Sequence, residues 1–186
     1  MAVVRWSKLF TRRYPVKGAT EPELRSLVSS LATPLTEEEA EAINASQSNP
    51  FPSSDPSHLI YKPFDPRKWL FPTTSLPDSY LDFLGWSNGG SFFTGDRCFD
   101  PFIACNEVRN HLLGYHVPQY MPGAIPFAFD GGGRFYLFDM RREPIAGEYP
   151  ILFVGSGNLC YADAVHVAAS FIDACKGTSD PSERSS

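Results

Sequence analysis

The feature that most constrains the fold is a run of three glycines, Gly131 to Gly133, set between two segments rich in aromatic and branched residues. Glycine enters backbone conformations with positive φ at little cost, and two β-prone segments joined by such residues are typical of a hairpin. The second segment, Arg134 to Asp139, is almost continuously apolar, which favours a strand covered on both faces. We therefore predict a hairpin over residues 125–139 within a sheet against which helices pack.

A glycine-rich loop can instead cradle a phosphate group. That function needs the loop to open into a helix, because the N-terminal amides and the helix dipole attract the anion. The residues after Gly133 have strand composition and no helical period. We interpret Gly131, Gly132 and Gly133 as a structural turn, and we expect at least one of them to have positive φ.

The composition is that of one globular domain, because 186 residues with 42% apolar and 20% charged residues can bury a sizeable core. The net charge of −5 argues against general nucleic-acid binding and suits a basic partner. Four cysteines without a Cys-x-x-Cys pair indicate small buried groups in a reducing compartment, although disulfides stay open. No apolar run is long enough to span a membrane, and we expect a cytoplasmic protein without a cofactor or a metal.

The N-terminal segment carries five basic residues and no acidic one up to Thr20. Arg5 and Lys8 interrupt the apolar core that a secretory signal requires, so we do not expect secretion. A basic, acid-poor start is also typical of an organelle transit peptide. Our expectation for residues 1–19 is a basic arm or an edge strand.

Two capping boxes predict two helices. They are Thr20 to Glu23 and Thr36 to Glu39. In a capping box, the threonine side-chain oxygen accepts from the backbone amide three residues on, and the glutamate side chain accepts from the backbone amide of the threonine. The first helix should end before Pro34 and the second at about Ser46. Between Asn49 and Pro77, seven prolines alternate with aromatic residues, so we predict an ordered insert, 49–75, wrapped on the core, with a polyproline ligand as the alternative.

The remaining elements follow from local signals. Residues 76–90 predict a helix closed by a left-handed cap at Asn88 and Gly89. Strands are predicted at 91–95, 99–104 and 149–154, and a helix capped by Asn106 should end by Pro118. Apolar residues at three- and four-residue steps predict a last helix over 164–175, stopped by Gly177 and followed by a disordered tail, 178–186.

Three stretches in this order resemble the Smi/Knr-type family, also called the SUKH superfamily. They are Leu76-Pro77-x-x-Tyr80-x-x-Phe83-Leu84 running into Asn88-Gly89-Gly90, the hairpin from Ile125-Pro126-Phe127-Ala128 to Gly133-x-Phe135-Tyr136, and Ala169-Ser170-Phe171. The resemblance covers about Thr20 to Gly177, apart from the proline-rich insert. It implies an α+β domain with a twisted, mostly antiparallel sheet. It also implies a binding protein without known catalytic residues, because many bacterial relatives are immunity proteins that silence a toxin and fungal relatives regulate the cell wall and signalling.

Patterns that would indicate an enzyme are weaker than the family resemblance. His111 and His116 are five residues apart, which places them on different sides of a helix and not at a zinc-binding spacing. Cys105 with His111, or Cys160 with His166, would pair only through the tertiary fold. Carboxylates at turns could form a glycosidase pair, but a sequence does not show which of them converge.

Our hypothesis is a non-catalytic immunity protein that binds a basic nuclease- or deaminase-type toxin, with a regulatory scaffold as the alternative and an undetected hydrolase as the third reading. Trp86 is the candidate anchor, against the alternative that it is a core residue. Acidic residues at turns and helix starts are the candidate partner contacts: Asp78, Asp82, Asp96, Asp100, Asp130 and Asp139.

Overall fold

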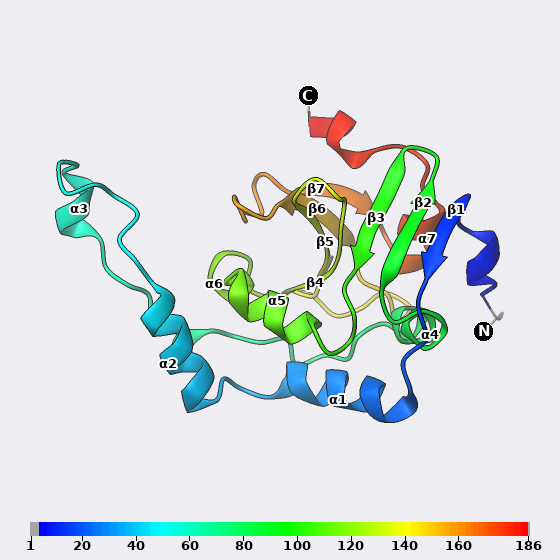
Figure 1. Ribbon diagram of the computed structural model, residues 1–186, viewed down its shortest axis with the longest axis horizontal. Helices are drawn as coiled ribbons and strands as arrows, with labels where there is room; N and C mark the ends of the chain where they lie inside the picture. Colours follow the sequence, from blue (N-terminus) through cyan, green and yellow to red (C-terminus); the bar gives the residue numbers. More distant parts are fainter. Residues whose placement is uncertain (1–3, 186) are drawn as a thin grey trace.

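The computed structural model describes residues 4–185, so Met1 to Val3 of the expected N-terminal arm and Ser186 of the tail lie outside the described residues. Seven strands form one open antiparallel sheet in which every strand pairs with its neighbours in the chain (Figure 1). The strands are β1 (Arg12–Pro15), β2 (Gly90–Thr94), β3 (Arg97–Phe102), β4 (Ala124–Phe129), β5 (Arg134–Asp139), β6 (Ile151–Gly155) and β7 (Val165–Ala168). The predicted single-domain α+β fold is confirmed.

Helices cover this sheet and extend beyond it. They are α1 (Glu21–Ala32), α2 (Glu37–Ser46), α3 (Ser57–Ile60), α4 (Asp78–Trp86), α5 (Val108–Gly114), α6 (Val117–Tyr120) and α7 (Phe171–Lys176), with short 3₁₀ turns η1 (Trp6–Lys8), η2 (Pro66–Lys68) and η3 (Pro181–Ser185). Both predicted capping boxes are present: the Thr20 amide donates to Glu23 over 2.7 Å, and the Thr36 amide donates to Glu39 over 2.9 Å.

The central hairpin is present as predicted, with β4 and β5 paired along their length. Gly131 and Gly133 have φ of +78° and +89°, whereas Gly132 is not in the positive-φ region. The Asp130 carboxylate closes the turn by accepting from the amides of Gly132 (2.7 Å) and Arg134 (2.9 Å). The conformational need for glycine therefore lies at the two outer positions.

Strand β5 is covered on both faces, as its apolar run predicts. Tyr136 lies 4.6 Å from Phe99 between ring centroids, on the face where α4 and α7 pack. Its neighbour Phe135 points to the opposite face, where the Tyr115 ring at the end of α5 meets it edge-on at 4.8 Å. Burying aromatic residues on both faces contributes on the order of 2 kcal/mol per side chain, which makes this strand the centre of the core.

The last predicted helix is half wrong. Residues 165–168 form strand β7, and only Phe171–Lys176 is helical, with the Ser170 hydroxyl accepting from the Asp173 amide at the N-cap. Val165, His166 and Val167 alternate as a strand does, and β6 offers an unpaired edge on which they form a ladder. Gly177 ends the helix as predicted.

Two predicted caps are also wrong. Ser87, in extended conformation, is the C-cap of α4, and Asn88 is not left-handed; its side chain instead accepts from the Cys105 amide over 2.7 Å. Gly89 and Gly90 do have positive φ, +107° and +96°, and lead into β2. Glu107, not Asn106, precedes α5, which ends at Gly114, and Pro118 lies in the first turn of the separate helix α6.

The proline-rich insert packs on the core only in part. Phe71 packs against the main core, and residues 72–75 line a pocket together with Ile125 of β4. Trp69 and Phe64 instead pack with Leu113, and α3 lies at the end of an extension away from the sheet (Figure 1).

The tail is held rather than disordered at its start, because the carbonyls of Thr178 and Ser179 accept from Asp96 and Arg97. Of the two possibilities considered for residues 1–19, the structure has an edge strand, β1, which pairs with β2. Trp6 before it is buried.

We predict that Gly133→Ala lowers the free energy of unfolding by about 1–2 kcal/mol, because a Cβ atom is strained at positive φ. No other atom lies within 4 Å of the position that this Cβ atom would take, so the loss isolates backbone strain. Gly132→Ala is the control and should change stability by less than about 0.5 kcal/mol. Urea denaturation measures both, and equal losses would contradict the assignment.

Candidate functional site

The predicted contact residues do not form one surface. Asp82 and Trp86 lie one turn apart on α4, and Asp100 and Asp130 form a bridge between β3 and the end of β4. Asp139 is at the opposite end of β5 from the glycine turn. The structure thus brings these residues together in two pairs.

The first pair borders an open groove between η1, α1 and α4. Its volume is about 600 Å³, and its wall is mostly apolar. The lining residues are Val4, Trp6, Glu21, Leu24, Leu81, Asp82, Gly85 and Trp86. We call it the Trp86 groove.

The floor of the Trp86 groove is tied to the core. The Trp6 indole is 3% exposed, meets Phe83 edge-on at 5.3 Å and donates from Nε1 to Asp82 Oδ2 over 2.8 Å. Trp86 is half-buried, with its ring 5.7 Å from Phe83 and 5.4 Å from Phe92. Part of the Trp86 side chain therefore packs on the core, and the rest is exposed in the groove.

Two carboxylates give the groove an acidic rim. Asp82 and Glu21 are both exposed. Glu21 is 4.0 Å from Arg25, a surface ion pair of small energetic value. An aromatic and aliphatic wall beside carboxylates is complementary to a protein surface that presents apolar groups next to Lys or Arg.

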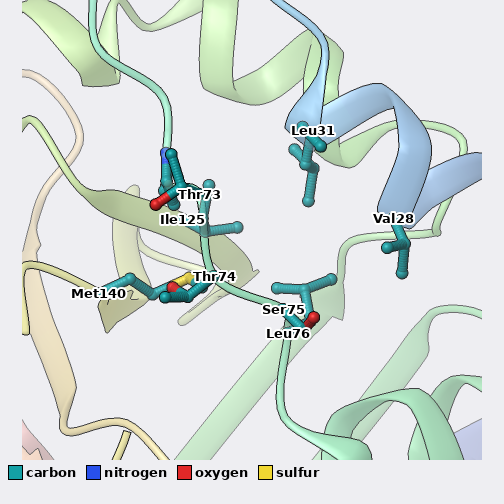
Figure 2. Close-up of a pocket in the computed structure, with 10 residues that line it drawn as sticks. Val28, Leu31, Thr73, Thr74, Ser75, Leu76, Ile125 and Met140 are labelled. Carbon is teal, nitrogen blue, oxygen red and sulfur yellow. The ribbon is translucent and has the colours of Figure 1, made fainter. Parts of the chain in front are cut away.

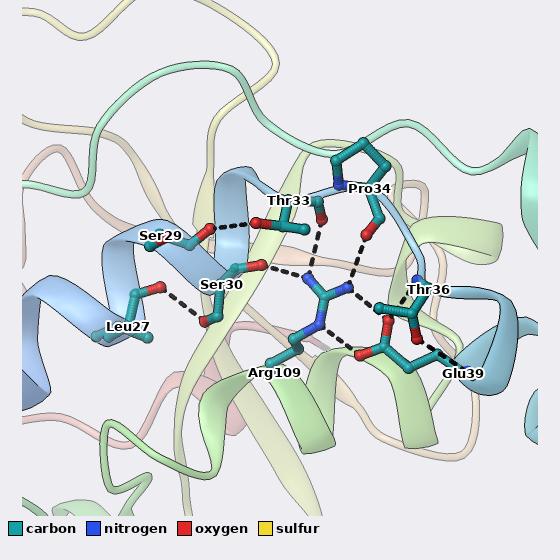
Figure 3. A network of polar contacts seen from close by, with 8 residues as sticks. All are labelled: Leu27, Ser29, Ser30, Thr33, Pro34, Thr36, Glu39 and Arg109. Atoms are coloured by element: carbon teal, nitrogen blue, oxygen red, sulfur yellow. Dashed lines mark hydrogen bonds and ion pairs between the residues drawn. The ribbon is translucent and has the colours of Figure 1, made fainter.

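The wall formed by α1 is held in place by Arg109 of α5 (Figure 3). Its guanidinium group donates to the carbonyls of Ser30, Thr33 and Pro34 at the end of α1, and forms a two-pronged ion pair with Glu39 of α2 at 2.7 Å per contact. The hydrogen bonds from Arg109 lower the pKa of Glu39 to about 2. One side chain thus joins α1, α2 and α5.

The second pair, Asp100 and Asp130, performs structural tasks. Asp100 accepts from the Ser91 hydroxyl, and Asp130 closes the glycine turn. Burial, with a further contribution from these two carboxylates, raises the pKa of the neighbouring Cys98 to about 11. That thiol stays protonated near neutral pH and is a poor nucleophile.

The negative charge of Asp139 is neutralised by an ion pair within the chain. Its carboxylate is paired with Arg141 at 2.7 Å, and this guanidinium group lies 3.6 Å from the Tyr161 ring centroid. The hydrogen bonds from Arg141 lower the pKa of Asp139. Asp78 and Asp96 are exposed at the start of α4 and at the β2–β3 turn.

A narrower apolar pocket lies between α1 and the segment that precedes α4 (Figure 2). Val28, Leu31, Ile125 and Met140 supply its apolar walls, and residues 72–76 border it. Its lining contains no titratable group. The pocket therefore offers packing space but no acid–base chemistry.

The histidines considered for catalysis make contacts other than those that a catalytic site would need. His111 Nδ1 is 2.9 Å from the Glu107 carbonyl oxygen, and its ring stacks with Tyr115. His116 packs against Phe64 and Trp69, and burial lowers its pKa. Within residues 4–185, no three His, Cys, Asp or Glu residues are grouped as a metal site would require.

A family comparison decides the class of the protein. The model of the SMI1/KNR4 family (SUKH-1) matches residues 70–175, more than half of the chain. The chain belongs to this family. No curated protein matches it. None of the helices in the described part of the chain is long and apolar enough to cross a membrane.

The SUKH-1 segment supplies only one side of the Trp86 groove. Asp82 and Trp86 lie inside residues 70–175, whereas Trp6, Glu21 and Leu24 come from the N-terminal part of the chain. The sequence suggested Trp86, Asp82 and, among the tryptophans, Trp6 as contacts, but not Glu21 or Leu24. The apolar Leu24 and buried Trp6 are ordinary core signals, and only the fold shows that they line a groove.

We predict that Arg109→Lys destabilises the protein by about 2 kcal/mol, because an ammonium group cannot reproduce the planar fork that serves Glu39 and three carbonyls. Arg67→Lys is the matched control, since Arg67 pairs with Glu37 on the exposed surface. Thermal and urea unfolding measure both variants. A loss at position 109 no larger than at position 67 would contradict this role.

Glu39 should also make stability depend on pH. Its folded-state pKa is depressed from 4.5 to about 2, so its contribution is complete above pH 4.5 and is lost as the pH falls towards 2. Glu39→Gln should cost on the order of 1 kcal/mol at pH 6 and almost nothing at pH 2. Unfolding free energies across this range test it, with Glu38→Gln as control. A deficit that does not change with pH would show that charge is not the cause.

Proposed function

We propose that this SUKH-1 protein is a non-catalytic immunity protein that occludes the active cleft of a nuclease- or deaminase-type toxin. The observation that carries the proposal is the Trp86 groove, where an aromatic wall adjoins Asp82 and Glu21. Membership of the SUKH-1 family supports a binding function of the immunity or regulatory kind.

The groove has the composition of an interface centre. Partly buried tryptophan is enriched among residues that dominate binding energy, and Trp86 is already fixed by Phe83 and Phe92. A pre-fixed ring loses little conformational entropy when a partner covers it. A stable complex would bury about 1,600 Å² in total, so the groove would form the centre of a larger contact.

The charge distribution suits a basic target. All 21 acidic residues follow Thr20, together with only eleven of the sixteen basic ones. The body of the protein is therefore more acidic than the whole chain. A toxin that binds nucleic acid carries a basic cleft, and opposite fields accelerate encounter.

We predict that Asp82→Asn slows association with the cognate toxin module by about threefold or more at low salt. The amide oxygen of asparagine can still accept from Trp6 Nε1, so the charge is lost while the 2.8 Å hydrogen bond of the fold is kept. Asp163→Asn, at an exposed turn outside the groove, is the control. Stopped-flow association at two salt concentrations measures the effect.

A flat salt response of the unmodified protein would contradict the electrostatic part of the proposal. The other candidate carboxylates, Asp78, Asp96, Asp100, Asp130 and Asp139, stay predictions, and the same series of Asp→Asn variants tests them. A change at one of these positions and none at Asp82 would move the contact to another surface.

Trp86→Ala should accelerate dissociation of that complex by at least tenfold, because a central aromatic anchor is removed. Trp86→Phe should retain part of the affinity, and Tyr120→Ala, at a residue 52% exposed outside the groove, should retain all of it. Surface plasmon resonance gives both rates. Failure of every toxin candidate to bind the unmodified protein would favour the regulatory class.

A further inference from the structure

The extension that carries α3 exposes two large aliphatic side chains at its far end. Leu59 is 87% and Ile60 75% exposed, and they are consecutive in the chain. Figure 1 places α3 away from the sheet, beyond α2. We call residues 48–63 the arm. Single exposed apolar residues are ordinary, but an adjacent pair at the end of a protrusion requires an explanation.

The base of the arm is clamped. The Gln47 side chain accepts from the Phe64 amide over 2.9 Å and donates to the Phe64 carbonyl over 2.9 Å, which ties the two ends of the arm together. Below this clamp Phe64 stacks on Trp69, whose ring is 5.6 Å away and whose Nε1 donates to Gln119 over 2.9 Å. The arm therefore starts from a fixed platform.

The end of the arm is held by its own side chains. Asn49 donates to the His58 carbonyl over 2.9 Å, and His58 Nδ1 lies 2.7 Å from the Phe51 carbonyl. The Asp55 carboxylate accepts from the Ser57 amide over 2.7 Å at the start of α3. These contacts fix the backbone around Leu59 and Ile60 without burying either side chain. A backbone segment that is fixed in advance loses little conformational entropy when a partner covers it.

On the basis of the proposed function, we propose that the arm is a second contact site for the protein partner. Leu59 and Ile60 insert there into an apolar pocket whose rim is basic. The arm lies wholly outside residues 70–175, so this contact is an addition to the SUKH-1 segment. The arm itself carries one acidic and one basic residue, Asp55 and Lys62. Its contact therefore acts through burial of apolar surface.

The net charge of the protein selects the kind of partner. Helix α2 leads into the arm, and its exposed carboxylates Glu38 and Glu41 lie towards the end away from the arm, while η2 beside α2 carries Arg67 and Lys68. A second copy of this chain, at net charge −5, would bring like charges together, and an anionic lipid surface would be repelled. A protein pocket that is apolar inside and has Lys or Arg at its rim matches both the aliphatic pair and the acidic net charge of the chain.

The test uses the full chain with a photoreactive benzoylphenylalanine at position 59 and a matched probe at position 145, where Ile145 is 82% exposed at another turn. Each protein is irradiated with the purified toxin module and with vesicles of phosphatidylcholine and phosphatidylglycerol. We expect position 59, and not position 145, to cross-link to an apolar peptide of the toxin module with Lys or Arg nearby. An adduct with a second copy, with lipid or with nothing would overturn the proposal.

Kinetics of the double variant Leu59→Ser/Ile60→Ser provide the second measurement. Dissociation of the toxin complex should accelerate at least tenfold while the salt dependence of association stays unchanged, because the contact is apolar. Leu59 and Ile60 are exposed, so the melting temperature should stay within about 2 °C. Ile145→Ser is the control, and an unchanged dissociation rate of the double variant would overturn the inference.

The two proposals fail in different ways. Faster dissociation with Trp86→Ala but not with the arm variant would refute the contact at the arm and leave the immunity function intact. If Leu59→Ser/Ile60→Ser abolishes binding and Trp86→Ala does not, the contact lies on the arm, and the proposal that the Trp86 groove is the contact site is refuted. A toxin module that does not bind the unmodified chain would overturn both.

Discussion

The fold depends on arginine side chains that satisfy the carbonyl groups at helix ends. The last carbonyls of a helix have no partner within it, and leaving them unpaired away from water costs free energy comparable to a lost hydrogen bond. Arg109 donates to the carbonyls of Ser30 in the last turn of α1, of Thr33 at its C-cap and of Pro34 just beyond it, and pairs with Glu39 at the start of α2. Because α1 forms one wall of the Trp86 groove and α2 leads to the arm, both proposed contact regions depend on this guanidinium group.

Arg97 does the same at α7. It is 2% exposed and donates to the carbonyls of Ala174 and Ser179, which joins the end of α7 to the tail. A Cβ atom on Gly177 would lie 1.9 Å from the Arg97 guanidinium, so a larger residue there would displace this group, although the φ of −63° suits any residue. Lysine at position 97 or 109 could not make all of these hydrogen bonds, because its single ammonium group lacks the planar array of donors of a guanidinium group.

Local signals in the sequence predicted most of the elements. The capping boxes of α1 and α2 and the glycine turn of the central hairpin involve residues within four positions of each other. Residues 165–168 were misassigned because their apolar spacing fits both a helix and a strand, and pairing with β6 decides the outcome. The proline-rich insert was expected on the sheet, and Phe71 does pack against the main core, but Phe64 and Trp69 pack on Leu113 and His116 instead.

Less of the candidate site could be predicted from the sequence, because tertiary contacts between distant residues form it. The hydrogen bond between Trp6 and Asp82 joins residues 76 positions apart, so no local sequence pattern predicts it. Charge type alone also does not show which carboxylates are available. Asp139 is paired with Arg141 and Asp130 closes its own turn, whereas Asp82 keeps an exposed position beside the groove.

The division between residues 70–175 and the N-terminal part has a physical consequence for specificity. The sheet and its aromatic core lie mostly within the SUKH-1 segment, so substitutions there disturb packing and cost stability. Trp6, Glu21 and the arm lie outside it, and the arm makes its fixing contacts almost entirely with itself. Residues 48–63 can therefore change without loss of the core. A binding protein built this way can alter its choice of partner at the arm and at the rim of the groove, while Arg109 continues to hold both on an unchanged scaffold.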